Sequence, residues 1–414
     1  MLDSFFSSLP SLASGRLACR VSSDALRQVR SGHPWVWAEA ISSCSDEQAA
    51  AGTLAVIFDQ KRKFAAIGLW DPTSPIRIRV LHAGKPTTID DAFWDQRIAD
   101  AINIRQPLHA AGTTGYRVLH GENDGFGGLV VDRYADTLVA KVYTEAWLPH
   151  LAPVLRALHT QLHPDRIVLR LGRLLARSVT AATHGLADGM VIDGTAPDGP
   201  IPFLENDLVF EADVLDGQKT GHFLDQRDNR LHLRHHSAGA DVLDVFSCTG
   251  GFSVNAALGG AASVHSVDIS PHAIATVGRN FGHNPTAANG TRTRSTVGDA
   301  FEVMADLAAS GERYDIVVID PPSFASKASE RDGAMRAYRK LTELGLPLLR
   351  PGGRLLQASC SSRITEDDLV HTVDAAVRSQ GRELHSPEIT GHAIDHPVTF
   401  PQGRYLKAIS AVID

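Results

Sequence analysis

The chain has 414 residues, a length that indicates two or three domains rather than one core. Hydrophobic residues make up 43% of it and charged residues 21%, which is typical of a soluble globular protein. The 35 glycines and 21 prolines are dispersed, so no long disordered tract is indicated. The formal net charge of -7 excludes a uniformly basic surface, and binding to nucleic acid would therefore require a locally basic face.

Neither the cysteines nor the N-terminus indicates a secreted or membrane protein. Cys19, Cys44, Cys248 and Cys360 form no metal-ligand spacing and are too few for a disulfide framework. Residues 1–14 lack a basic residue and predict neither a signal peptide nor a transit peptide, and no stretch approaches the roughly eighteen apolar residues of a membrane helix. We therefore expect a cytoplasmic protein, without a membrane partner, that is a monomer or a homodimer.

The first segment, residues 15–89, is predicted to be a small β-rich domain. Apolar runs at 54–58 and 64–70 are separated by a polar turn, and residues 76–80 alternate with the period of a half-exposed strand. Counted from the first residue, this part of the chain has ten Lys and Arg against seven Asp and Glu. It is therefore positive within a negative chain, which marks a domain and favours one that faces RNA.

The second segment, residues 90–195, is predicted to mix helix and strand, and prolines at 197, 200 and 202 then indicate a linker. Its arginines at 166, 170, 173 and 177 form either an RNA-facing surface or an ordinary charged exterior. The apolar spacing predicts helices at 91–105 and 151–162, a strand at 166–171, and a hairpin of 128–134 with 137–143 turned at Ala135 and Asp136.

The third segment, residues 196–414, has a different pattern. Short apolar runs at 242–246, 264–268, 314–320 and 353–358 alternate with segments of helical length. Near-continuous apolar strands are buried on both faces, so the sheet should be mostly parallel with crossover helices. This predicts a doubly wound, Rossmann-like α/β domain, in which ligands bind outside the carboxyl ends of the strands.

The first strand end that carries polar residues is 244–251, which reads Asp-Val-Phe-Ser-Cys-Thr-Gly-Gly. Glycines let the backbone approach a ligand closely where a side chain would collide. The string is not the GxGxxG of dinucleotide-binding proteins, which argues against hydride transfer. A tight turn without a ligand is the alternative.

Two single aspartates end later strands. Asp268 can accept hydrogen bonds from two ribose hydroxyls, and Asp299 can contact an adenine amine. Each is equally well explained as a helix N-cap.

The most specific short motif is Asp320-Pro-Pro-Ser-Phe324, which follows a buried strand. Two prolines remove backbone donors and make a rigid exit that holds the carboxylate at the crevice. Cys360 ends the next predicted strand, and the ends of neighbouring strands lie about 5 Å apart. A lone cysteine is usually inert, but a thiol and a carboxylate that converge on one substrate ring indicate catalysis.

The assembled motifs resemble the class I methyltransferases that modify carbon 5 of cytosine in large-subunit (23S) ribosomal RNA and carry an N-terminal PUA domain. The resemblance spans nearly the whole chain. It rests on the strings at 32–37, 121–134, 216–230, 396–397 and 405–407, of which 216–230 is the most distinctive.

The resemblance implies S-adenosyl-L-methionine as cofactor, ribosomal RNA as partner, and no metal. It implies a seven-stranded, mostly parallel sheet preceded by a PUA domain and a central α+β domain. Residues 219–227 would close over the cofactor, and the substrate base would lie against residues 321–324. The implied cofactor-binding residues are Lys219, Phe223, Asp225, Arg227, Asp244, Phe246, Thr249, Gly250, Gly251, Asp268, Asp299 and Asp320, and those implied to bind substrate are Pro321, Pro322 and Phe324.

The implied chemistry assigns Cys360 and Asp320 as the catalytic residues. Attack of the Cys360 thiolate on carbon 6 makes carbon 5 nucleophilic, and Asp320 hydrogen-bonds or protonates ring nitrogen 3. The base that removes the carbon-5 proton is not identifiable from the sequence.

Two alternatives stay open at this stage. An RNA amino- or guanine-nitrogen methyltransferase would use Asp-Pro-Pro to orient an amine, with Cys360 incidental. A non-catalytic RNA-binding assembly factor would have kept only the fold. A cluster of His232, His235 and His236 hints at a metal, but it lacks further ligands in the sequence and is better explained as a solvated helix face.

Overall fold

The protein is described by a computed structural model that covers residues 2–217, 220–325 and 327–414. The chain divides into two compact units. Unit 1 contains the residues up to Phe203 together with Ala212–His222 and Ile394–Pro401, and unit 2 contains Leu204–Glu211, Phe223–Ala393 and Gln402–Asp414. None of the described helices combines the length and the apolar content that spanning a bilayer requires.

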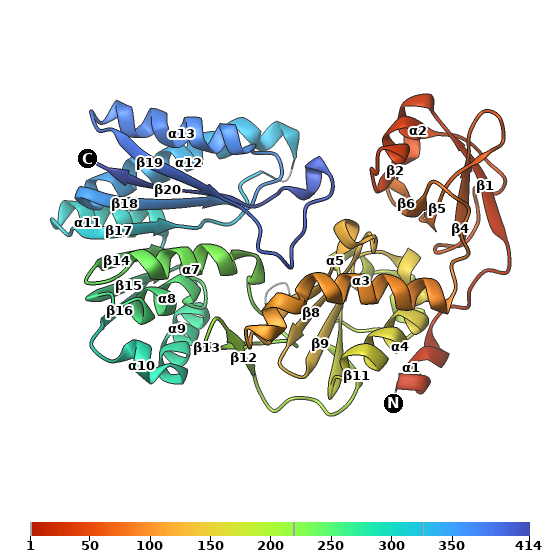
Figure 1. The fold of residues 1–414 in the computed structure, drawn as a ribbon, viewed down its shortest axis with the longest axis horizontal. Helices are drawn as coiled ribbons and strands as arrows, with labels where there is room; N and C mark the ends of the chain where they lie inside the picture. Colours follow the sequence, from red (N-terminus) through yellow and green to blue (C-terminus); the bar gives the residue numbers. More distant parts are fainter. Residues whose placement is uncertain (1, 218–219, 326) are drawn as a thin grey trace. The chain divides into compact units, whose positions relative to one another are not determined.

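Unit 1 begins with a six-stranded sheet in the order β2-β6-β5-β4-β1-β3 (Figure 1). Its pairs are antiparallel except β1 with β4, and Val36, Ile57 and Ile78 lie buried within it. The strands predicted from the apolar runs are all present. The elements are α1 (Leu2–Ser8), β1 (Arg16–Val21), α2 (Ser23–Arg30), β2 (Trp35–Trp37), β3 (Ile41–Cys44), β4 (Leu54–Phe58), β5 (Phe64–Trp70) and β6 (Ile76–Ala83).

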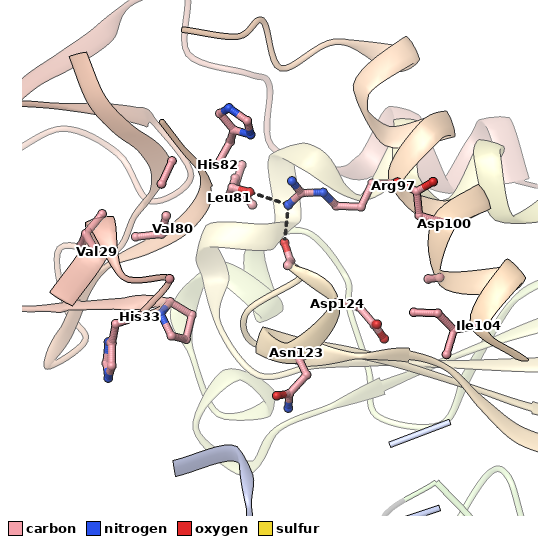
Figure 2. Close-up of a pocket in the computed structure, with 15 residues that line it drawn as sticks. Val29, His33, Val80, Leu81, His82, Arg97, Asp100, Ile104, Asn123 and Asp124 are labelled. Carbon is pink, nitrogen blue, oxygen red and sulfur yellow. Dashed lines mark hydrogen bonds between the residues drawn. The ribbon is translucent and has the colours of Figure 1, made fainter. Parts of the chain in front are cut away.

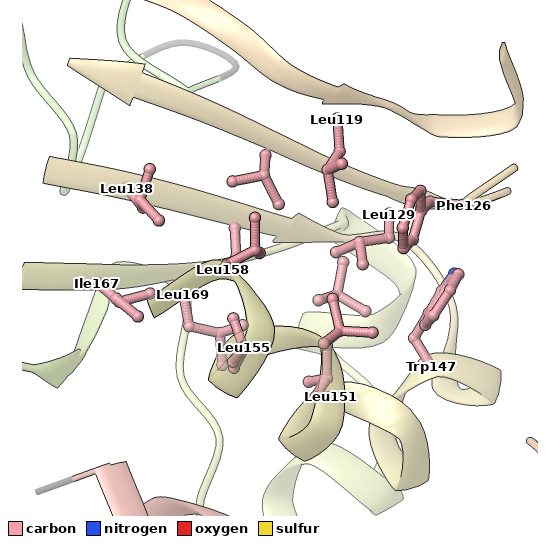
Figure 3. Packing of buried hydrophobic residues seen from close by; sticks show 14 of the residues in the cluster. Leu119, Phe126, Leu129, Leu138, Trp147, Leu151, Leu155, Leu158, Ile167 and Leu169 are labelled. Atoms are coloured by element: carbon pink, nitrogen blue, oxygen red, sulfur yellow. The ribbon is translucent and has the colours of Figure 1, made fainter. Parts of the chain in front are cut away.

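A five-stranded sheet in the order β11-β10-β9-β8-β7 forms the rest of this unit's core. The predicted hairpin is β8 with β9, and Ala135 in its turn has a left-handed φ of 52°. Figure 3 shows Leu151, Leu155 and Leu158, on one face of α4, packed against this sheet. The elements are α3 (Asp91–Ala110), β7 (Gly115–His120), β8 (Leu129–Tyr134), β9 (Thr137–Val142), α4 (Leu151–Leu162), β10 (Arg166–Leu171), α5 (Arg173–Ala176), α6 (Val179–Thr183) and β11 (Met190–Asp193).

Two expectations for this part of the chain were wrong. Pro202 does not lie in a linker but inside β12 (Ile201–Glu205), which pairs with β13 (Leu208–Ala212). Proline is tolerated there because its position is exposed and the sheet has only two strands. Arg170 is neither RNA-facing nor exterior, because it is buried and binds the Asp188 carboxylate at 2.9 and 3.3 Å.

Arg105 organises the polar interior of unit 1. Its guanidinium is 1% exposed and binds both oxygens of Asp124 at 3.1 and 2.6 Å. It also donates to the backbone carbonyl of Asp395 at 2.8 Å, and the Asp395 carboxylate accepts from the backbone N–H of Arg117. The segment 394–401 is thus fixed by buried, charge-assisted hydrogen bonds to residues almost 300 positions earlier in the chain.

Unit 2 contains a seven-stranded sheet in the order β16-β15-β14-β17-β18-β20-β19. The pairs from β16 to β18 are parallel, and only those of β20 are antiparallel, as the doubly wound prediction requires. Its strands are β14 (Asp241–Val245), β15 (Ser263–Asp268), β16 (Arg292–Val297), β17 (Tyr314–Ile319), β18 (Leu349–Ser359), β19 (Leu384–Thr390) and β20 (Lys407–Ile413).

The helices of unit 2 form two sets because the strand order reverses between β14 and β17. Right-handed crossovers place α8 and α9, which lead away from β14 on one side, on the face opposite to α11 and α12 (Figure 1). The helices are α7 (Arg227–His236), α8 (Gly251–Leu258), α9 (Pro271–His283), α10 (Pro285–Ala288), α11 (Ala300–Ala309), α12 (Arg331–Gly345) and α13 (Glu366–Ser379).

We predict that Arg105→Met lowers the free energy of unfolding by about 3–5 kcal/mol, because it leaves the Asp124 carboxylate buried without its cation. Urea denaturation followed by tryptophan fluorescence measures the change. The matched control is Arg378→Met, which breaks an exposed pair with Asp374 and should cost less than about 1 kcal/mol. Equal losses in the two variants would contradict the structural role given to Arg105.

Candidate active site

The carboxyl ends of β14, β17 and β18 meet at one edge of the sheet. Val245 pairs with Ile319, and Ile319 pairs with Gln357, so the three strands end within a few residues of the same level. The residues that follow them are therefore delivered to one place. This edge is where a doubly wound sheet binds its ligands.

Cys360 follows β18 directly and is half-buried. Its Sγ lies 3.9 Å from the backbone carbonyl oxygen of Pro321, in the loop that follows β17. The thiol therefore faces the Asp-Pro-Pro loop rather than the apolar core, and the proximity expected from the strand order is present. Its catalytic role stays a prediction.

Asp320 is held by residues that the sequence did not single out. Gln226 donates from Nε2 to Asp320 Oδ1 at 2.8 Å, and Asn229 donates to Gln226 Oε1 at 2.5 Å. Both amides are at least 97% buried, which fixes the orientation of the carboxylate. Gln226 was inside the distinctive 216–230 string, but only the fold shows which side chain it faces.

The two prolines and Phe324 occupy different environments. Pro321 is buried, Pro322 is exposed, and Phe324 is half-buried. The Phe324 ring packs edge-on against Tyr338 of α12, with centroids 5.2 Å apart. Phe324 therefore also supports the core, and a substrate contact by these three residues stays a prediction.

The loop between β14 and α8 has an unusual backbone. Phe246 and Cys248 have φ angles of 64° and 47°, in the left-handed region that disfavours residues other than glycine, and Gly250 has φ 81°. Such strain persists where surrounding contacts hold it, and it clusters at ligand sites. Here the backbone N–H of Ser247 donates to the Val267 carbonyl, so β15 holds the loop.

The glycines of this loop are needed for packing, and their contact with a ligand stays a prediction. A Cβ on Gly251 would lie 2.8 Å from Arg230 Cδ, and one on Gly250 would lie 3.1 Å from Val277 Cγ1. Arg230 in turn forms a buried ion pair with Glu205 at 2.5 Å. A larger residue at 251 would therefore displace a buried charge.

Asp244 is fully buried, and burial raises the pKa of its carboxyl to about 7. Oδ2 accepts from Ser253 Oγ of α8 at 2.6 Å. Among the described residues, Oδ1 has no hydrogen-bond partner, and neither has Ser247 Oγ nearby in the same loop. Two buried oxygens without partners at the strand end are suited to an ammonium group.

Asp268 and Asp299 both bind backbone N–H groups. Asp268 accepts from the N–H of Cys248 at 2.9 Å and from that of Ser270 at 2.9 Å, so it joins two loops of the edge. Asp299 caps α11 through Oδ1, which accepts from the N–H groups of residues 301 and 302. The N-cap alternative is thus correct for Asp299, although a cap does not exclude an additional ligand.

Thr249, between the loop glycines and Cys248, is half-buried.

The segment before α7 contributes buried side chains. Asp225 accepts from the Tyr405 hydroxyl at 2.9 Å, Arg227 is 1% exposed, and the Phe223 carbonyl accepts from Arg230 at 2.9 Å. The predicted ligand Lys219 lies outside the described residues. Tyr405 belongs to the C-terminal string, whose role the sequence left open.

The histidines of α7 do gain a further candidate ligand from the fold. His232 and His236 lie one turn apart, and Glu388 of β19 brings a carboxylate oxygen to 3.8 Å from His232 Nδ1. The other Glu388 oxygen pairs with Arg354 at 3.5 Å. The positive charge of this guanidinium disfavours the binding of a divalent cation by the cluster. Burial and the charge on His236 lower the pKa of His232.

A separate pocket of about 370 Å³ lies in unit 1, between β6 and α3. Figure 2 shows His33 and His82 on one side of it, and Arg97 and Asp100 of α3 on the other. Burial lowers the pKa of Arg97 to about 10, and its guanidinium binds the backbone carbonyls of residues 81 and 125. None of the predicted site residues lines this pocket.

Two family models match the sequence, one for the expected methyltransferase domain and one for the expected PUA domain. A model of S-adenosylmethionine-dependent methyltransferases matches residues 194–403, and a model of a PUA-like domain matches residues 20–83. Together with the doubly wound sheet, these matches define a class I methyltransferase that uses S-adenosylmethionine, and they confirm the predicted fold class and cofactor.

Relatives along almost the whole chain narrow the class to a family. A ribosomal RNA large subunit methyltransferase from Deinococcus radiodurans is 46% identical over 98% of this chain and 100% of its own length. A ribosomal RNA large subunit methyltransferase I from Enterobacter sp. (strain 638) is 34% identical over 91% of this chain and 94% of its own. The chain belongs to this family of methyltransferases.

Solved structures support the fold. A structure that is assigned to the methyltransferases and is complexed with SAH superposes with a TM-score of 0.80 at 21% identity, over 95% of this chain and 99% of that chain. A structure from Streptococcus mutans, assigned to the S-adenosylmethionine-dependent methyltransferases, gives a TM-score of 0.79 at 21% identity with the same coverage.

We predict that Asp244→Asn changes the pH dependence of stability. The pKa of Asp244 rises from its ordinary value of 3.8 to about 7 on folding, so the folded state retains a proton that the unfolded state releases. The wild type should therefore lose stability relative to the variant between about pH 4 and pH 7, by up to about 1.4 kcal/mol per pH unit, and no further above pH 7. Urea titrations of both proteins from pH 5 to pH 8 measure this, and a constant difference would contradict it.

Proposed function

We propose that this protein transfers a methyl group from S-adenosylmethionine to carbon 5 of a cytosine in large-subunit ribosomal RNA. The RNA substrate is supported by the names of the relatives in Deinococcus radiodurans and Enterobacter. The observation that carries the choice of cytosine carbon 5 is the Cys360 thiol, which faces the loop after Asp320 at the ligand-binding edge. A nitrogen methyltransferase has no need of a thiol at that position.

Carbon 5 of cytosine is too weak a nucleophile to accept a methyl group unaided. Attack by the Cys360 thiolate on carbon 6 forms a carbon–sulfur bond and moves electron density to carbon 5. The cofactor supplies the methyl group on a positively charged sulfonium. Transfer of the carbon-5 proton to a base then re-forms the double bond between carbons 5 and 6 and breaks the carbon–sulfur bond, whose electron pair returns to Cys360.

Asp320 acts on the other side of the base. Its hydrogen bond from Gln226 at 2.8 Å fixes the carboxyl group at the strand end, where its protonated form donates a hydrogen bond or its proton to ring nitrogen 3 while the thiolate adds to carbon 6. Carboxyl and thiol follow adjacent strands, so they can address opposite parts of one pyrimidine. Pro322, exposed beside them, offers a flat surface for the ring.

The residues at the edge also fit the cofactor. The buried Asp244 Oδ1 and Ser247 Oγ are acceptors for the amino group of its methionine part. Asp268 would hold the ribose hydroxyls, and Asp299, whose helix cap uses only Oδ1, would receive the adenine amine on Oδ2. The segment 223–227, with its buried Asp225 and Arg227, would close the site.

We predict that Cys360→Ala lowers methylation of large-subunit RNA by at least about 10³-fold while binding of S-adenosylmethionine is retained. The measurement combines tritium transfer to RNA with calorimetry of cofactor binding. Cys44→Ala, which changes a cysteine of β3 in unit 1, is the control and should keep its activity. A Cys360→Ala enzyme with wild-type activity would favour the nitrogen methyltransferase, and a wild type that fails to bind the cofactor would favour an assembly factor.

The exposed turn Lys61-Arg62-Lys63, between β4 and β5, is the densest basic site in the PUA-like domain. We predict that changing all three residues to serine raises the KM for RNA and flattens the dependence of binding on salt, by about 0.7–0.9 in logarithmic slope for each lost phosphate contact. The kcat at saturating RNA should not change. Arg378→Ser, which removes an exposed charge from α13, is the control, and the same salt dependence in the triple variant and the wild type would contradict RNA contact at this turn.

A further inference from the structure

Lys407 is the first residue of β20, and its side chain is buried next to the end of β18. The antiparallel pairing sets Lys407 opposite Ser359, the residue that precedes Cys360. Although lysine is almost never fully buried in proteins unless it is paired, Lys407 is only 2% exposed. Strand pairing alone therefore does not explain why a lysine is buried at this position.

The Lys407 ammonium holds the turn that begins at Cys360. Nζ donates to the backbone carbonyls of Ser361 and Ile364, both at 2.5 Å. Two of its three N–H groups are thus used to close the turn around it. Because both acceptors follow Cys360 within four residues, the ammonium fixes the backbone that carries the thiol.

Lys407 has no carboxylate partner among the described residues. The acidic groups whose charges act on Lys407, Asp368 and Glu366 at the start of α13, pair with other cations. Asp368 binds Arg331 at 2.5 Å, and Glu366 lies 3.9 Å from Arg404. Burial lowers the pKa of Lys407 to about 8, and the neighbouring charges of Cys360, Asp368 and Glu366 oppose that shift. At neutral pH the side chain is still mostly cationic.

Two other ionisable groups among the described residues near the thiol, Asp320 and Tyr338, do not favour its anion. Asp320 adjoins Pro321, whose carbonyl the thiol faces, and whenever its carboxyl is ionised the negative charge opposes a thiolate. Tyr338 of α12 accepts a hydrogen bond from Ser359 Oγ at 2.8 Å, and burial raises the pKa of its phenol, so it stays neutral. The buried ammonium of Lys407 carries the positive charge that favours the thiolate.

We propose that Lys407 is the positioning residue of Cys360, which fixes the turn that carries the thiol and stabilises the thiolate. The inference rests on the proposed function, in which Cys360 is the nucleophile. The thiol proton leaves to solvent, the lysine stays protonated throughout, and the same charge stabilises the sulfur when the carbon–sulfur bond breaks at the end of the reaction. A desolvated ammonium does this far better than an exposed one.

The test measures the thiol directly and does not depend on methylation. The full-length protein is treated with iodoacetamide between pH 5.5 and pH 9.5, and alkylation is followed by mass spectrometry of the tryptic peptide 355–363, in which Cys360 is the one cysteine. Cys248, whose pKa burial raises to about 11, is followed in the same digests as an internal reference.

In the wild type, the midpoint for Cys360 should lie below the ordinary value of about 8.5. Lys407→Met keeps the length of the side chain and removes its charge, so the midpoint should rise by at least about one unit and alkylation at pH 7 should fall about tenfold. Lys407→Arg keeps the charge and should restore most of the shift. The Cys248 profile should be the same in all three proteins.

A folded Lys407→Met protein with the wild-type midpoint would overturn the proposal. If that variant does not fold, the wild type decides, since a midpoint at or above about 8.5 is incompatible with a stabilised thiolate. The two proposals can fail separately. If Lys407→Met abolishes an acid shift in the Cys360 midpoint while Cys360→Ala leaves the enzyme fully active, the covalent mechanism is wrong and the assignment of Lys407 still holds.

Discussion

The parallel pairing of β14, β17 and β18 is the constraint on which the site depends. It delivers Asp244, Asp320 and Cys360 from positions spread over more than a hundred residues to one edge of the sheet. The pairing is enforced by burial, because Val245 and Ile319 are completely buried and a register shift of one residue would turn them out of the core. The core of unit 2 thus fixes the geometry of polar groups that contribute nothing to it.

Buried charges, rather than the shape of a cleft, distinguish this edge from an ordinary strand end. Burial brings the pKa of Asp244 up to about 7 and that of Lys407 down to about 8, so two groups that are normally far apart in acidity both titrate near neutral pH. A specific hydrogen bond holds each side chain in its buried position. Ser253 donates to Asp244, and Lys407 donates to the turn after Cys360. The free energy lost by burying them is consistent with selection for chemistry rather than for stability.

The sequence predicted the elements better than the contacts between them. Residues 151–162 and 166–171 were predicted to the residue, because their apolar periodicity records local burial. Gln226 and Lys407 could not be assigned in this way, since their partners lie 94 and 43 to 46 positions away. Arg170 was misjudged for the same reason: its charge indicated exposure, and only the fold supplies Asp188 and two carbonyls to bury it.

The order of the chain explains how a residue from the far C-terminus comes to lie beside the turn that carries Cys360. After β19 the chain passes through residues 394–401, which Arg105 and Asn123 hold within unit 1, and then returns as β20 between β18 and β19. A strand inserted there is antiparallel to β18, so its first residue, and not its last, comes level with the end of β18. Lys407 occupies that first position. The cation beside Cys360 therefore comes from the first residue of a reversed strand, whereas a parallel strand would have placed its last residue at this edge.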